Sequence, residues 1–244
     1  MKINNLKVAK SNKVILNNFN AEFESGKIHI IMGQNGSGKT TMSYTIAGHP
    51  DCEVLDGNIE YNNLSLLDLE IYERSINGVF LAPQYPSVIE GLSHAAFLKE
   101  AINIRRNHFN LEPLDEFEFL KLLKEKAKQF NFDPKEYIRH SLNSGYSGGE
   151  KKRNEILQIA LLEPKFIILD EIDSGLDIEA MKLIADFINS YLSPDVTILA
   201  ITHYPHFAKL LNAEKTHIIK QGKIVKSGDI SLVDHIEKNG FGEL

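Results

Sequence analysis

The sequence predicts an α/β fold in which a mostly parallel sheet is covered by helices. Three short apolar runs, at residues 28–32, 166–169 and 196–201, have the composition of strands that are buried on both faces. A glycine-rich loop and a helical pattern follow the first run, and helical patterns separate the later ones. Strands that alternate with helices in this way favour parallel pairing.

The other segments extend this prediction in chain order. Alternating apolar residues indicate three short strands, around residues 3–8, 14–16 and 19–23, and we expect them to form a smaller antiparallel sheet. Further strands are expected at residues 57–61 and 79–81. Residues 217–219 and 223–226 flank Gln221-Gly222, a pair that suggests a hairpin turn.

The region of about residues 88–161 differs from its surroundings, because most of it has helical periodicity with charged faces. We therefore expect one domain over residues 1–244. Its core and β-subdomain would take about residues 1–87 and 162–244, and an inserted helical subdomain about residues 88–161.

Composition and charge argue against several classes of function. The chain has 244 residues, a formal net charge of −6 and a single cysteine. One cysteine allows no internal disulfide and no thiolate cluster for a metal, and the negative charge argues against nonspecific nucleic-acid binding. No apolar run approaches the roughly 20 residues of a membrane span. The first residues lack a charged-then-apolar pattern, so we expect no secretion signal. We expect a cytoplasmic protein without direct membrane insertion, with a plastid stroma left open.

The loop after the first buried run carries the clearest chemical pattern. Its eight residues fit Gly-x-x-x-x-Gly-Lys-Thr at every required position: Gly33, Gln34, Asn35, Gly36, Ser37, Gly38, Lys39 and Thr40. Glycines let the backbone N–H groups point at phosphate oxygens, and the following helix adds the positive end of its dipole. Lys39 can reach the β- and γ-phosphates, Thr40 can ligate Mg²⁺, and Thr41 can donate to the α-phosphate. We therefore predict that the loop binds Mg-ATP.

Two acidic residues end the second buried run. A buried strand delivers Asp170 to the carboxyl edge of the sheet, where the phosphate loop also opens. Asp170 would hold Mg²⁺, through water, and Glu171 would lie near the attacking water as general base or orienter. An apolar run that ends in Asp-Glu is a weak signal alone, and it becomes strong only beside a phosphate loop.

A second pair of glycines distinguishes this chain from other phosphate-loop proteins. Ser147-Gly148-Gly149 lies ahead of a predicted helix and forms a second anion-binding helix terminus. With this segment, the chain resembles the ATP-binding cassette (ABC) ATPases, a P-loop NTPase family. The resemblance implies that Ser147–Gly149 reaches across a head-to-tail homodimer and clamps the partner's γ-phosphate.

The resemblance also assigns three further residues. Gln84 resembles the loop glutamine that senses Mg²⁺ and the attacking water, and His203 resembles the switch histidine at the γ-phosphate. Asp177 resembles a residue of the segment that crosses the dimer seam. With Glu171 and Lys39, Gln84 and His203 complete the implied catalytic set.

The chain departs from the family pattern at two places. Glu150 replaces the usual glutamine after the two glycines, and an anion near phosphate would be unfavourable unless it points away or pairs with a neighbouring cation. We assign Glu150 no ligand role. The adenine-stacking aromatic expected near residue 14 is also replaced, by Lys13-Val14-Ile15, so affinity would depend mostly on the phosphates.

Residues 145–165 and 170–178 resemble, more narrowly, the SufC family, the ABC-type ATPases of SUF iron–sulfur cluster assembly. This resemblance implies SufB and SufD as partners, with ATP-driven dimerisation that rearranges their scaffold. A transporter motor with a separate membrane subunit remains the alternative function. A ribosome- or repair-type ATPase is disfavoured, because such proteins usually carry two cassettes or a long coiled-coil insertion.

Overall fold

The computed structural model describes residues 1–129, 135, 138 and 140–242. Residues 130–134, 136–137 and 139, which fall in the predicted helical subdomain, and residues 243–244 lie outside the described part. The chain forms two compact units. The first contains Met1–Gln84, Lys165–Ser174 and Met181–Leu244, and the second contains Tyr85–Pro164 and Gly175–Ala180.

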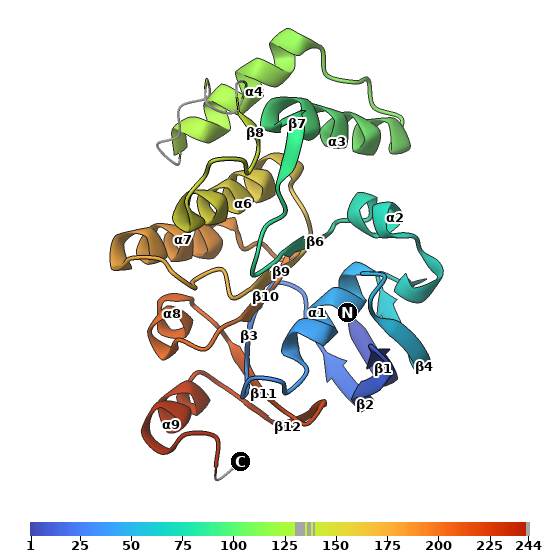
Figure 1. Cartoon of the computed structure of the whole chain (residues 1–244), viewed down its shortest axis with the longest axis vertical. Helices are drawn as coiled ribbons and strands as arrows, with labels where there is room; N and C mark the ends of the chain where they lie inside the picture. The colour runs from blue at the N-terminus through green and yellow to red at the C-terminus, as the bar shows by residue number, and fades with distance from the viewer. Residues whose placement is uncertain (130–134, 136–137, 139, 243–244) are drawn as a thin grey trace. The chain divides into compact units, whose positions relative to one another are not determined.

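A six-stranded sheet forms the centre of the first unit (Figure 1). Its order is β12-β11-β3-β10-β9-β6, and all neighbours pair in parallel except the edge strand β12. The strands span β3 Ile28–Met32, β6 Val79–Ala82, β9 Phe166–Asp170, β10 Thr197–Ile201, β11 Lys215–Lys220 and β12 Lys223–Gly228. Every residue of β3, β9 and β10 is buried, which confirms the prediction of strands covered on both faces.

The register of the central strands brings the functional segments to one edge. Ile201 at the end of β10 pairs with Asp170 of β9 and with Ile31 of β3. The residues that follow these strands are the phosphate loop, Glu171 and His203. Because parallel strands share their carboxyl edge, residues far apart in the chain meet there.

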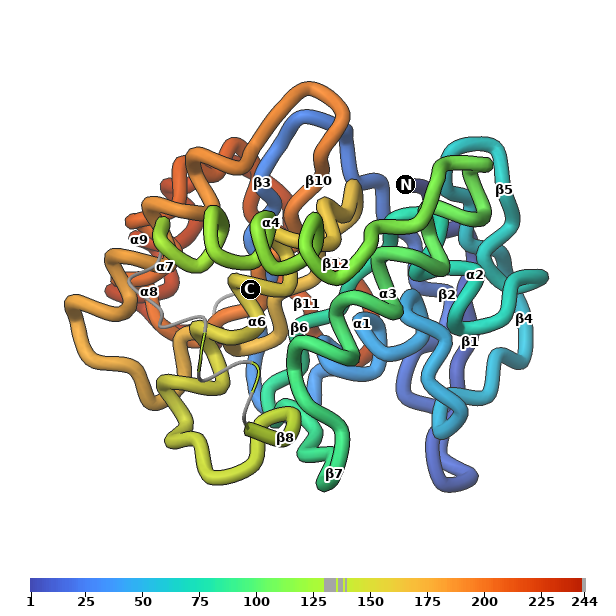
Figure 2. Tube along the Cα trace, turned by 90° about the horizontal axis from the view of Figure 1, so that it is seen from above, coloured from blue at the N-terminus to red at the C-terminus, as the bar shows by residue number. Residues whose placement is uncertain are grey.

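An antiparallel sheet of order β2-β1-β4-β5 lies in the same unit, as predicted. It contains β1 Lys2–Lys10, β2 Lys13–Glu22, β4 Glu53–Tyr61 and β5 Leu64–Ser65, and Figure 2 shows β1 beside β2. The two strands expected at residues 14–16 and 19–23 are one continuous strand, β2. Asn18 has φ 54° and shifts the register without ending the strand, so the sequence break was misleading.

Short helices of the first unit connect the strands. They are α1 Lys39–Ala47, η1 Leu66–Asp68, α2 Ile71–Ile76, most of α7 Ile178–Tyr191, α8 Pro205–Leu210 and α9 Ser231–Asn239. Buried Arg74 of α2 donates to the carbonyls of Thr45 (2.8 Å) and Ile46 (3.1 Å) at the end of α1. The Thr45 carbonyl also accepts from the N–H of Gly48 at 3.1 Å, so Arg74 adds donors at the end of α1, where carbonyls lack the usual helical partners.

The hairpin β11–β12 turns at Gln221 and Gly222, as predicted from their sequence. Both residues have positive φ, 49° and 73°, which suits a two-residue hairpin turn. A Cβ on Gly222 would lie 2.1 Å from the carbonyl oxygen of Ile15. Gly222 N–H donates to the carbonyl of Ser37 at 2.8 Å, so the turn supports the phosphate loop from behind.

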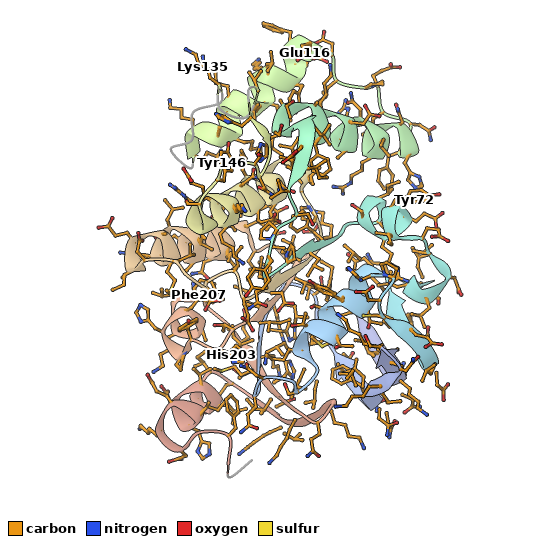
Figure 3. All side chains as sticks on the ribbon, in the orientation of Figure 1. Tyr72, Glu116, Lys135, Tyr146, His203 and Phe207 are labelled. Carbon is orange, nitrogen blue, oxygen red and sulfur yellow. The ribbon has the colours of Figure 1, made fainter. Side chains whose placement is uncertain are left out.

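The second unit is mostly helical. It contains β7 Ile89–Ser93, α3 His94–His108, α4 Glu116–Gln129, β8 Ser141–Leu142 and α6 Gly148–Leu162, with a two-stranded sheet of β7 and β8 that was not predicted. Tyr146, labelled in Figure 3, stacks on the buried ring of His94 at 5.2 Å just before α6. Among the described residues, no helix combines the length and apolarity that crossing a bilayer requires.

Candidate nucleotide site

The phosphate loop adopts a conformation that requires its glycines. Gly36 and Gly38 have φ of 76° and 110°, in the region where side chains are strained. A Cβ on Gly33 would lie 2.3 Å from the carbonyl oxygen of Ile219. Gly38 is also the N-cap of α1, so the loop leads directly to the positive end of this helix.

Lys39 folds back over the loop. Its ammonium donates to the carbonyls of Gly33 (2.8 Å) and Gln34 (3.1 Å), and only 5% of the residue is exposed. Burial lowers the pKa of Lys39, while the nearby carboxylates of Glu171 and Asp170 raise it. The cation is therefore held at the loop, beside both acids that the sequence singled out.

Asp170 is fully buried at the end of β9. Its Oδ2 lies 2.9 Å from the Ser43 hydroxyl of α1, and its Oδ1 has no hydrogen-bond partner among the residues that the structure describes. Burial raises the pKa of Asp170, and so does the charge of Glu171, while the neighbouring Ser43 and Thr40 side chains and Lys39 oppose this shift. A bare carboxylate oxygen near the Thr40 hydroxyl is the type of oxygen-donor set that Mg²⁺ prefers, so the residues present fit this ion.

Glu171 lies between Gln84 and His203. Gln84 donates its side-chain amide to Glu171 Oε2, and His203 Nε2 lies 3.0 Å from Glu171 Oε1. Burial, followed by the charge of Lys39, lowers the pKa of His203, while Glu171 raises it. Since a carboxylate only accepts hydrogen bonds, His203 carries its proton on Nε2 and donates it to Glu171.

One cavity of about 700 Å³ unites most of the predicted residues. From the predicted set, its lining contains Asn35, Gly36, Gly38, Lys39, Thr40, Thr41, Gln84, Glu171 and His203. Gly33, Gln34, Ser37 and Asp170 do not line it, although Gly33, Gln34 and Asp170 contact or influence Lys39. His203, labelled in Figure 3, comes from the loop after β10.

Sequence reasoning assigned no role in the nucleotide site to three residues of this neighbourhood. Tyr204 follows His203 and lines the cavity, as does Ser174, and Ser43 binds Asp170 from the interior of α1. A serine at the fourth position after Lys39 was the available signal for Ser43, because a polar residue on the buried side of a helix needs a partner. Ile15, from the segment that replaces the stacking aromatic, also lines the cavity.

The remaining predicted residues belong to the second unit. Ser147 is the N-cap of α6, and its hydroxyl accepts from the N–H of Glu150 at 3.3 Å. Glu150 Oε2 accepts from the N–H of Ser147 at 2.7 Å, which completes a capping box. Glu150 is thus occupied by the end of its own helix. Asp177 is exposed and accepts from the N–H of Ala180 at 2.7 Å in the first turn of α7.

Comparison with known proteins identifies close relatives. The family model described as ABC transporter matches residues 16–174. A probable ATP-dependent transporter SufC of Escherichia coli is 43% identical, over 100% of this chain and 98% of its own length. A probable ATP-dependent transporter of Synechocystis is 45% identical (99% and 94%), and an iron-sulfur cluster assembly protein SufC of Plasmodium falciparum is 43% identical (95% and 66%).

Solved structures share the fold. A dimeric ATP-binding cassette bound to ADP and phosphate superimposes with a TM-score of 0.77 at 20% identity, covering 94% of this chain and 98% of its own. A nucleotide-free cassette from an ABC transporter gives 0.78 at 18% identity, covering 98% and 94%. At these identities the likeness concerns the fold alone, and the family follows from the full-length sequence matches. Taken with the phosphate loop and its cavity, they show that the chain is an ATPase of the ABC family and belongs to its SufC branch.

Proposed function

We propose that the protein is the ATPase subunit of the SUF iron–sulfur cluster assembly complex. It would bind Mg-ATP, dimerise and rearrange a scaffold of SufB and SufD. The name of the P. falciparum relative, an iron-sulfur cluster assembly protein SufC, supports the assembly role, and the E. coli relative shares the name SufC. The observation that carries the enzymatic part is the cluster of Glu171, Gln84 and His203 in the cavity of the phosphate loop.

The loop residues Gly33–Thr40 and Thr41 would hold the phosphates of ATP. Thr40 and Asp170 would hold Mg²⁺, with Gln84 near it, and the bound ion would neutralise charge on the phosphate oxygens. Ile15 offers an apolar contact to the base at the cavity wall. The same residues would release ADP more readily, because ADP offers Lys39 no γ-phosphate.

The hydrolytic step follows from the surroundings of Glu171. Its carboxylate accepts hydrogen bonds from Gln84 and His203, and these hold it in one orientation at the cavity. From there Glu171 would align the attacking water and accept its proton. His203 would then exchange its bond to Glu171 for one to the γ-phosphate, as Lys39 exchanges its two carbonyls for phosphate oxygens.

A second copy of the chain would complete the site. Ser147, Gly148 and Gly149 present the N-terminus of α6, and a Cβ on Gly148 would meet nothing within 4 Å. An exposed helix terminus without side chains suits the γ-phosphate of ATP held by another protomer. Asp177 would lie at the seam. ATP would therefore bridge two chains, and hydrolysis would remove the bridge.

The enzymatic proposal is tested by Glu171→Gln and Lys39→Ala, with Glu60→Gln, at an exposed residue of strand β4, as the control. Glu171→Gln should retain ATP binding, lower turnover by about 10²-fold or more, and accumulate an ATP-bound dimer in gel filtration. Lys39→Ala should lose most ATP binding. Turnover at the wild-type rate in Glu171→Gln would refute the role of Glu171. Full-rate hydrolysis by the monomer would refute the shared site.

The assembly role is tested by affinity capture of the tagged chain from its native extract. Recovery of SufB and SufD supports the proposal. Several relatives are named as probable ATP-dependent transporters, so the second candidate function is a transporter motor. Recovery of a polytopic membrane subunit instead of SufB and SufD would favour it. We propose the cytoplasm, or the stroma of a plastid, as the compartment, and fractionation of the same extract tests this.

A further inference from the structure

Ser43 lies on the same face of α1 as the residues that approach the nucleotide. It follows Thr40 by three positions, so the two hydroxyls are stacked one helical turn apart. Ser43 is fully buried, and its hydroxyl lies 2.9 Å from Asp170 Oδ2 on strand β9. This contact joins the helix of the phosphate loop to the acid at the neighbouring strand end.

The hydroxyl of Ser43 has one proton and two acceptors within reach. Its oxygen lies 2.9 Å from both the Thr40 carbonyl and Asp170 Oδ2. The carbonyl of residue 40 already accepts the helical N–H of Tyr44, whereas the buried carboxylate has lost its water. A hydrogen bond to an ionised acceptor is about twice as strong as a neutral one, so the proton goes to Asp170.

The two oxygens of Asp170 are consequently unequal. Oδ2 is held by Ser43, while Oδ1 is buried and has no hydrogen-bond partner in the described part of the chain. An ionised carboxylate oxygen that is removed from water needs a donor or a cation. Fixing Oδ2 to α1 therefore fixes the direction in which the bare oxygen points.

We propose that Ser43 is a positioning residue for Mg²⁺: it holds one oxygen of Asp170 so that the other is presented to the ion beside Thr40. The inference rests on the proposed function, in which Thr40 and Asp170 hold Mg²⁺. Ser43 itself contacts neither the ion nor the nucleotide. Its removal frees Oδ2 and lets the Asp170 side chain rotate, which weakens the Mg²⁺-dependent part of nucleotide binding.

The test is equilibrium binding of a non-hydrolysable ATP analogue to the full chain, in Mg²⁺ and in EDTA. The readout is the ratio of the two affinities for each variant. In Ser43→Ala the ratio should fall on the order of 10-fold, the usual effect of removing a group that orients a metal ligand, while the affinity in EDTA stays within about twofold. Ser43→Thr, which restores a hydroxyl, should recover the ratio.

Thr45→Ala is the matched control. Thr45 is a buried hydroxyl residue of the same helix, but it donates to the Thr41 carbonyl (2.7 Å) and not to Asp170. It should keep the wild-type ratio. If Ser43→Ala does not fold, Ser43→Cys replaces it, because a thiol of similar size is a weak donor.

Two outcomes overturn the inference. One is a wild-type ratio in Ser43→Ala or Ser43→Cys, and the other is an equal loss of affinity in Mg²⁺ and in EDTA, which would show a general defect of the loop. A failure of the underlying Mg²⁺ site gives a different result. If Asp170 does not hold Mg²⁺, Asp170→Asn also keeps the wild-type ratio. If only the role of Ser43 is wrong, Asp170→Asn still lowers the ratio.

Discussion

Two buried histidines on neighbouring strands predict a loss of stability in mild acid. His29 of β3 and His217 of β11 stack at 5.4 Å, and His29 Nδ1 lies 3.1 Å from His217 Nε2. His29 Nε2 lies 3.2 Å from the Glu24 carbonyl, which only accepts. His29 Nδ1 must therefore accept from His217 Nε2–H, and His217 Nδ1 accepts from the Ser227 hydroxyl at 2.8 Å. Both rings are neutral in this chain of hydrogen bonds, and a proton added to His217 would place a positive charge in a buried position.

The magnitude follows from the pKa of His217. Burial, the first cause, and the charges of His29 and Lys215 lower this pKa from 6.5 to about 4, and Glu24 opposes them. Burial also lowers the pKa of His29. Because the unfolded chain binds the proton more readily, the stability contributed by His217 is present above pH 6.5 and is lost as pH falls toward 4. The loss is about 2 kcal/mol by pH 5 and about 3 kcal/mol below pH 4.

Urea unfolding followed by circular dichroism between pH 8 and pH 4.5 measures this loss. The comparison is with His217→Gln, which keeps a polar side chain but does not titrate, and with His206→Gln at an exposed position of α8. Subtracting the variant removes the titration of all other groups. The difference between wild type and His217→Gln should shrink by about 2 kcal/mol from pH 8 to pH 5. Parallel pH profiles of stability for wild type and His217→Gln would refute the reasoning.

Three other predictions concern separate parts of the chain. Burial raises the pKa of Glu155 on α6 to about 8, above its unfolded value of 4.5. The folded protein therefore loses stability as pH rises between these values. In thermal melts, the stability of Glu155→Gln relative to wild type should increase from pH 5 to pH 8. Gly222→Ala should cost about 2 kcal/mol or more in urea unfolding, whereas Gly240→Ala, with positive φ but open space around it, should cost less. Thr41→Ala should weaken ADP binding measured by calorimetry, and an unchanged affinity would contradict its contact with the α-phosphate.

Local signals predicted the central parts of the fold. The buried strands, the glycine loop and the turn at Gln221-Gly222 depend on residues close in sequence, and the structure contains all of them. Strand β2 was divided in error because Asn18 interrupts the apolar alternation. Its left-handed conformation absorbs the interruption, and backbone φ cannot be read from residue type alone.

The contacts between distant residues were harder to predict. Gln84 meets Glu171 across 87 positions, and the sequence indicated this pair only through the family resemblance. In the sequence, Ser43 looked like an ordinary helix residue, because its partner Asp170 lies on strand β9, far away in the chain. The His29–His217 pair depends on β3 and β11 being neighbours, which follows from strand order and not from either segment. The role of Glu150 could not be predicted, because it depends on the direction in which its side chain turns at the start of α6.

The folded-back ammonium of Lys39 has a consequence for which ligands the loop selects. Its bonds to the Gly33 and Gln34 carbonyls keep the loop curled before any ligand arrives. When a ligand binds, Lys39 therefore exchanges one set of acceptors for another. The net free energy gained is the difference between its hydrogen bonds to phosphate oxygens and its bonds to the two carbonyls. Adenosine or a nucleoside monophosphate has no β- or γ-phosphate oxygen for the ammonium of Lys39, so this exchange adds no binding free energy. The loop thus discriminates by phosphate chain length before any part of the base is read.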